Sequence, residues 1–157
     1  MKHSSDVRKK RLFLEACVGL LIAAAIVAAI VVSARQKLSA TDVRIDTGDL
    51  RTLAASARLL ASNDLAGKAT DTFRTQQASL MLSNAMSIHR ALDGSPPEPD
   101  IVLEHWKARH LARQLEDSLQ RMSKPSADFA AEADICGRLA SQLSGLEDGL
   151  KQRPEQE

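Results

Sequence analysis

The longest uncharged stretch of the chain lies near its N-terminus and predicts a membrane anchor. Residues 16–34 carry no charge, and Leu12, Phe13 and Leu14 extend the apolar run to residues 12–34. A helix of that length spans roughly 34 Å, which exceeds a hydrocarbon thickness of about 30 Å. We therefore expect residues 12–34 to form a retained transmembrane anchor. The alternative is a cleaved secretion signal with its cleavage site at residues 32–34.

Basic residues on the two sides of this run predict its orientation. Five Lys and Arg side chains lie within residues 1–11, and four follow the run in a comparable window, namely Arg35, Lys37, Arg44 and Arg51. The positive-inside rule places residues 1–11 in the cytoplasm and the rest of the chain outside. The Ala-, Leu- and Arg-rich composition is compatible with a Gram-negative bacterium. We expect a bacterial inner-membrane protein with a periplasmic C-terminal domain.

Two features inside the apolar run bear on its contacts. Glu15 lies four residues after Arg11, a spacing that predicts an ion pair at the membrane interface. The alternative partner is a cation of another subunit. Small residues also recur at helical spacing and predict packing against another transmembrane helix, although an Ala-rich run produces such ridges by chance. These residues are Gly19, Ala23, Ala25, Ala29 and Ser33.

The rest of the chain predicts four amphipathic helices. Residues 35–47 lack a sustained period and predict a connector, residues 48–150 predict the helical domain, and residues 151–157 predict a frayed tail. Gly67, the proline-rich segment 93–100 and the turn at 123–126 separate the helices. Four helices joined by short turns are best satisfied by an antiparallel bundle. The predicted fold class is all-α, with one transmembrane helix followed by an antiparallel four-helix bundle.

Each predicted helix has an apolar face that we expect to point into the bundle. Residues 48–65 place Leu50, Leu53, Ala54, Ala57, Leu60, Ala61 and Leu65 on that face. Thr70 caps the second helix, whose expected inner residues are Phe73, Gln77, Leu80, Met81, Asn84, Ile88 and Ala91. The third helix contributes Ile101, His105, Ala108, Leu111, Leu115, Leu119 and Met122. The fourth contributes Phe129, Cys136, Leu139, Leu143, Leu146 and Leu150.

The charge distribution argues against a nucleic-acid-binding protein. Residues 1–35 carry six basic and two acidic side chains, so residues 36–157 hold 15 basic and 18 acidic ones. A mildly acidic body does not attract phosphates, and its aromatic residues, Phe73, Trp106 and Phe129, are too few for base stacking. The two cysteines do not predict a disulfide framework, because Cys17 lies in the apolar run.

No motif of a known catalytic or cofactor-binding mechanism occurs in the sequence. Phosphate-binding glycine loops, nucleophile elbows, zinc-protease motifs and haem-attachment motifs are all missing. His105 and His110 lie about 140° apart on one predicted helix and cannot share a metal ion. We expect His105 to be a hydrogen-bonded core residue and Cys136 to be a buried one. The sequence therefore predicts a non-enzymatic protein without a metal or cofactor.

Two predicted helix surfaces are candidates for a partner site. The first is Trp106 with Arg109, His110 and Arg113, a composition typical of an interface anchor and also of a core-boundary Trp beneath a solvated face. The second recurs every four residues as Gly137, Ser141, Gly145 and Gly149. Each glycine inside a helix costs about 1 kcal/mol relative to Ala. Close approach of another helix explains such a row, and so does a marginally stable terminal helix.

The segment 49–73, "DLRTLAASARLLASNDLAGKATDTF", resembles uncharacterised single-pass membrane proteins of proteobacteria. In these proteins a Leu/Ala-rich helix ends in a turn that reads Gly, basic residue, any residue, Thr, and a Phe opens the next helix. Gly67, Lys68, Thr70 and Phe73 match that pattern here. The resemblance implies a helical extracytoplasmic domain on a single anchor and no known activity.

Two functions fit these features. The first is a membrane-anchored helical protein that contacts other proteins at the periplasmic face of the inner membrane, as a scaffold or accessory subunit of an envelope complex. Its expected partner is another envelope protein or a second copy of the chain. The alternative is a periplasmic bundle that binds a small ligand between its helices, an idea that rests on the polar residues Gln77, Asn84 and His105 on inner faces.

Overall fold

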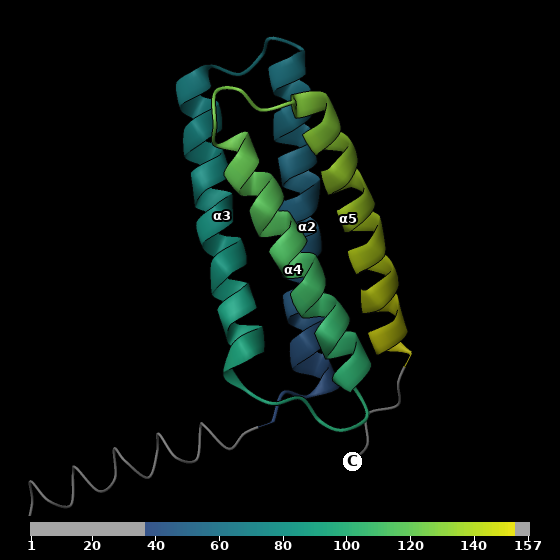
Figure 1. The fold of residues 1–157 in the computed structure, drawn as a ribbon. Coiled ribbons are helices and arrows are strands. Elements are labelled where there is room, and N and C mark those ends of the chain that lie inside the picture. The colour runs from purple at the N-terminus through teal and green to yellow at the C-terminus, as the bar shows by residue number, and fades with distance from the viewer. Residues whose placement is uncertain (1–36, 153–157) are drawn as a thin grey trace, which may run out of the picture. The chain divides into compact units, whose positions relative to one another are not determined.

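Four long helices account for nearly all of the chain that the structure, a computed structural model, describes, namely residues 37–152 (Figure 1). They are α2 (Ala40–Leu65), α3 (Asp71–Gly94), α4 (Val102–Met122) and α5 (Phe129–Lys151). They run up and down in chain order, so neighbouring helices are antiparallel. Within residues 37–152 the only β interaction is an isolated bridge between Leu38 and Pro97. The predicted all-α class and helical bundle are thereby confirmed.

The membrane-related predictions concern residues that the structure does not describe. The anchor 12–34, the pair of Arg11 and Glu15, and the small residues between Gly19 and Ser33 all lie within residues 1–36. The predicted tail, residues 151–157, also lies mostly outside the described residues, which end at residue 152. Among α2, α3, α4 and α5, none combines the length and the apolar character that a bilayer span requires.

Local capping signals determine where the helices begin and end. Thr70 accepts a hydrogen bond from the Phe73 amide and starts α3, as predicted. Gly67 ends α2 at a φ of 66°, a conformation that glycine adopts without strain. The Lys68 amide donates to the Asn63 carbonyl (2.9 Å) and the Gly67 amide to the Asp64 carbonyl (2.9 Å). These two bonds form a Schellman motif, which satisfies the last carbonyls of α2.

The prediction that residues 35–47 form a connector is wrong for most of that segment. Helix α2 begins at Ala40, because Ser39 and Asp42 form a capping box in which each side chain accepts from the other residue's amide. Val43, Thr47 and Leu50 are fully buried at helical spacing. The hydroxyl of the buried Thr47 donates to the Val43 carbonyl (2.6 Å), which hides the only polar atom of that side chain. The polar residues in this segment masked its helical period.

The core contains the apolar faces predicted for α4 and α5. Every expected inner residue of α4 is buried, and so are those of α5, except Leu146, which is half-buried. His105 is buried as expected, and its ring donates to the carbonyl of Leu92 in the last turn of α3 (2.7 Å). Cys136 is a free, buried cysteine, and burial raises the pKa of its thiol. On α2 the face is also as predicted, except that Leu53 is half-buried and Leu65 is exposed.

The predicted inner face of α3 is wrong by a rotation of about one residue. Met81 is buried as predicted, and Gln77 and Ile88 are half-buried. The other predicted residues, Phe73, Leu80, Asn84 and Ala91, are exposed, and the core instead receives Arg74, Ala78, Ala85 and Leu92. The cause is Arg74, whose guanidinium pairs with Asp64 and Asp71 at 3.0 Å and lies 4.7 Å from the ring centroid of Phe129. These contacts compensate the desolvation of a buried cation. Helix α3 therefore turns Arg74 inward and its neighbour Phe73 outward.

A buried carboxylate joins α4 to α5. Glu132 accepts from Ser118 (2.5 Å) and from two nitrogens of Arg121 (2.5 and 3.1 Å), and it is only 4% exposed. Ser118 also lies 3.3 Å from the sulfur of Cys136. The paired donors satisfy both oxygens of Glu132, as a buried carboxylate requires.

Replacement of Glu132 should weaken the bundle. Glu132→Ala leaves Ser118 without its carboxylate acceptor and opens a void. Arg121 is half-exposed and can reach water, so we expect a loss of about 2 kcal/mol, less than the roughly 3–5 kcal/mol for breaking a fully buried pair. Urea unfolding followed by circular dichroism measures the loss. Asp134→Ala on the exposed side of the same helix is the control, and equal effects of the two changes would contradict the assignment.

One half-buried acid on α2 predicts an unusual pH dependence. Burial, with Asp49 and Asp42 adding repulsion, raises the pKa of Asp46 from 3.8 to about 6. The folded state thus holds this proton more tightly than the unfolded state, so the Asp46 contribution to stability falls as pH rises from about 4 to 6. Asp46→Asn should stabilise the bundle at pH 7.5 by on the order of 1 kcal/mol, since water screens a half-exposed group. The gain should vanish at pH 3, where Asp46 is protonated in both states, and thermal melts at the two pH values measure it.

Candidate functional site

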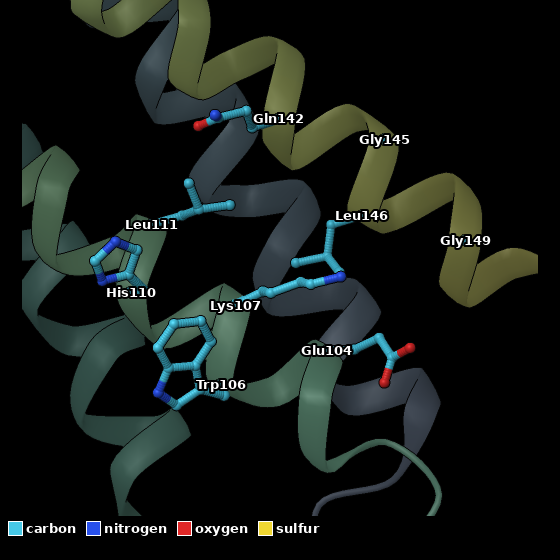
Figure 2. Close-up of a pocket in the computed structure, with 9 residues that line it drawn as sticks. All are labelled: Glu104, Trp106, Lys107, His110, Leu111, Gln142, Gly145, Leu146 and Gly149. Carbon is cyan, nitrogen blue, oxygen red and sulfur yellow. The ribbon is translucent and has the colours of Figure 1, made fainter.

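A groove between α4 and α5 contains residues from both surfaces that the sequence singled out (Figure 2). Trp106 and His110 line it from α4, and Gly145 and Gly149 line it from α5. The groove has a volume of about 490 Å³. Its remaining lining residues are Glu104, Lys107, Leu111, Gln142 and Leu146. Two patterns that lie about 40 residues apart in the sequence therefore meet at one place in the fold.

The α4 wall of the groove is a pair of stacked rings. Trp106 and His110 lie one helical turn apart, with ring centroids 5.4 Å apart and planes 3° from parallel. The side-chain amide of Gln114 lies 2.8 Å from Nε2 of His110, which continues the contact along the helix. Trp106 is 58% exposed, so most of its large apolar surface faces solvent. Flat rings held in this way offer contact area at little cost in conformational entropy.

The α5 side of the groove projects little into it, because Gly145 and Gly149 have no side chains. A Cβ atom added at Gly145 or at Gly149 would have nothing within 4 Å, so neither glycine serves close packing inside the bundle. Leu111 and the half-buried Leu146 supply the apolar floor. Figure 2 shows Lys107 extending from α4 across the groove toward Leu146. The groove therefore combines an apolar floor, an aromatic pair, the cation of Lys107 and the carboxylate of Glu104.

Ion pairs on α5 hold the groove in shape. Glu147 is largely buried and lies 3.3 Å from Nε of Arg51 on α2 and 2.7 Å from Nζ of Lys151. The hydrogen bond from Lys151 is the largest effect on the pKa of Glu147 and lowers it. Glu147 points toward α2, whereas Gly145 and Leu146 line the groove beside α4. Together with Glu132 near the other end of α5, these contacts determine the rotation of the helix about its axis.

The predicted four-residue surface on α4 splits into two parts. Arg109 turns away from the groove and pairs with Asp93 of α3. Arg113 is exposed and does not line the groove. Of the four, only Trp106 and His110 line the groove, and Arg109 differs from Trp106 by about 60° in direction around α4.

The predicted row on α5 also does not form one surface. A Cβ atom at Gly137 would lie 3.4 Å from Cδ of Arg58 on α2, and Ser141 is exposed outside the groove. A four-residue step advances about 40° around a helix, so Gly137 and Gly149 point about 120° apart. The row therefore winds from the α2 side of α5 to the groove.

The residues behind the small-ligand hypothesis do not meet. Asn84 is exposed on α3, Gln77 is half-buried, and the ring of His105 is committed to the Leu92 carbonyl. Residues 37–152 also contain no group of three or more His, Cys, Asp or Glu side chains placed to hold a metal ion. The groove floor was the part that the sequence did not identify, because Leu111 and Leu146 follow the core period, and their second role depends on α4 and α5 being neighbours.

Comparison of the chain with protein-family models, with curated proteins and with solved structures gave no match.

The groove glycines should be stability defects. Gly145→Ala adds a methyl group in open space and raises helix propensity, so we expect a gain of about 1 kcal/mol. Gly67→Ala should instead destabilise, because Gly67 has a positive φ. Chemical unfolding of the two variants tests both signs. A loss of stability in Gly145→Ala would mean that the backbone at Gly145 is strained or closely packed.

Proposed function

We propose that this protein is a non-enzymatic, membrane-anchored helical bundle that binds a helix of another envelope protein in the groove between α4 and α5. The single observation that carries the proposal is that groove, which an exposed aromatic pair lines on α4 and two glycines with open space beside them line on α5. In this proposal residues 12–34 are the anchor in the bacterial inner membrane, residues 1–11 are cytoplasmic, and the bundle is periplasmic. The anchor raises the effective concentration of the bundle near partners in the same membrane.

The lining of the groove indicates the chemistry of the partner. An amphipathic helix fits a groove whose floor is apolar, because its apolar face then leaves water. Absent side chains at Gly145 and Gly149 allow the backbone of a second helix to approach closely. Lys107 projects over the floor and favours a carboxylate on the incoming helix. Trp106 is the expected anchor residue, since partly exposed Trp side chains often dominate binding energy.

The selection of glycine supports a binding role over a purely structural one. Within a helix, Gly145 lowers stability relative to Ala, and nothing in the bundle requires its small size. A helix under selection for stability alone would replace it. An open wall that admits a partner explains the residue, and the same argument does not apply to Gly137, which lies against Arg58.

Filling the groove should abolish the contact without unfolding the bundle. A photo-reactive amino acid in place of Gln142, at the edge of the groove, should form a specific crosslink in intact cells that express the full chain. Gly145→Leu should remove that crosslink by occupying the space above Leu146. Ser141→Leu, which adds the same side chain one turn away and outside the groove, should retain it.

The outcomes of this experiment are separable. A crosslink that survives Gly145→Leu contradicts the groove as the binding site. A crosslinked product with the mass of two copies of this chain would show that the groove binds a second copy of the chain and not another protein. Unchanged circular dichroism of both leucine variants shows that the bundle remains folded.

A further inference from the structure

The start of α4 carries exposed apolar side chains, two of which, Val102 and Leu103, lie outside the groove. Val102 is 53% exposed, Leu103 58% and Trp106 58%, and with Pro99 they line one surface depression, whose other two lining residues are Asp100 and Glu104. We call Pro99, Val102, Leu103 and Trp106 the α4 apolar patch. Isolated exposed leucines are ordinary on a protein surface, but contiguous ones mark a contact. Ile101, Val102 and Leu103 are consecutive, so a helix that buries Ile101 must present the other two elsewhere.

We propose that the α4 apolar patch inserts into the headgroup region of the bilayer that holds the anchor; the inference rests on the membrane-anchored function proposed above. The partner is a lipid surface, and the contact is made at the end of the bundle where α2 and α4 begin (Figure 1). The patch lies on residues 99–106, well after the apolar run in the sequence. It would therefore be a second, separate membrane contact of the chain.

The chain path ties this end of the bundle to the apolar run. Leu38 donates its amide to the Pro96 carbonyl (3.0 Å) and accepts from the Glu98 amide (3.0 Å). The loop held in this way leads directly to the patch. Three residues, 35–37, separate the apolar run from Leu38, and such a link reaches at most about 14 Å. An anchored chain therefore keeps the patch end close to lipid.

The side chains of the patch match the chemistry of the membrane interface. Tryptophan is enriched there, since its ring is amphipathic, and Val102 and Leu103 supply apolar area beside it. The surrounding charges do not demand anionic lipids. Glu98, Asp100 and Glu104 offset Lys37 and Lys107 in the neighbouring sequence. We therefore expect a contact driven by apolar burial, which zwitterionic lipids support as well as anionic ones.

Trp106 makes this contact measurable because it is the only tryptophan of the chain. The full chain is reconstituted into phosphatidylcholine vesicles that carry brominated lipids with the bromine either near the headgroup or deep in the acyl chain. Headgroup-proximal bromine should quench Trp106 at least about twofold more than deep bromine, as expected for an interfacial ring. Acrylamide in the water should quench it weakly, and added salt should change neither result.

Variants with matched controls test whether the α4 apolar patch causes the quenching of Trp106 by lipid. Val102→Asp with Leu103→Asp should abolish quenching by lipid and restore quenching by acrylamide. Leu59→Asp with Leu65→Asp changes two leucines on α2 that are 65% and 58% exposed, and it should leave the wild-type result intact. Circular dichroism confirms that both pairs fold, and the wild-type measurement stands without any variant.

The possible failures are distinct. A chain that does not float with the vesicles after an alkaline wash contradicts the anchored function itself. A chain that floats, with Trp106 open to acrylamide and not quenched by bromine, overturns only the patch inference. Trp106 could also be shielded from both bromine and acrylamide, to an extent that rises with the number of protein molecules per vesicle. That result would assign the patch to a contact with a second copy of the chain and would likewise overturn the lipid contact.

Discussion

The two backbone hydrogen bonds between Leu38 and the loop before α4 hold the start of the helical domain against the end of the bundle where α4 begins. In an up-and-down bundle the turns alternate between the two ends, so α2 and α4 start at the end where α5 finishes. The hydrogen bonds of Leu38 with Pro96 and Glu98 join the residues just before α2 to the loop at that end. The exposed apolar patch and the mouth of the groove both lie there. Their positions relative to the start of the domain follow from the up-and-down order of the helices, and the Leu38 bonds hold the loop before α4 against the start of α2.

The groove depends in turn on how α5 is held. Helices α2 and α5 share the most extensive packing in the bundle, whereas α4 and α5 contact each other less. Two buried carboxylates set the rotation of α5: Glu132 pairs with α4 near one end, and Glu147 faces α2 near the other. Between these points the glycines at 145 and 149 face outward beside α4.

Much of the fold could be predicted from the sequence, and the failures share a cause. The faces of α4 and α5, the Gly67 turn and the Thr70 cap are local signals, and a local period or cap is readable without neighbours. The inner face of α3 was wrong because Arg74 is buried by Asp64 and by the ring of Phe129, which lies 55 residues away. The start of α2 was missed because its polar residues hide their own groups by capping and back-bonding. Sequence periodicity registers hydrophobicity alone and does not show which polar groups are buried with partners, whether these are near, as at the start of α2, or distant, as for Arg74.

The candidate site shows the same division between local and distant information. The sequence singles out four unusual residues, Trp106, His110, Gly145 and Gly149. Their union in one groove depends on the packing of α4 beside α5, which the sequence does not show. That union has a consequence for the kind of partner. Trp106 borders both the groove and the α4 apolar patch, and the groove opens at the same end of the bundle as the patch. If this end lies against lipid, as proposed, a helix that leaves the bilayer enters the groove directly, whereas a protein free in the periplasm must approach along the membrane surface. The geometry of the two proposals together favours a partner with a membrane span of its own, whose first extramembrane turns lie beside Trp106 and above Gly149.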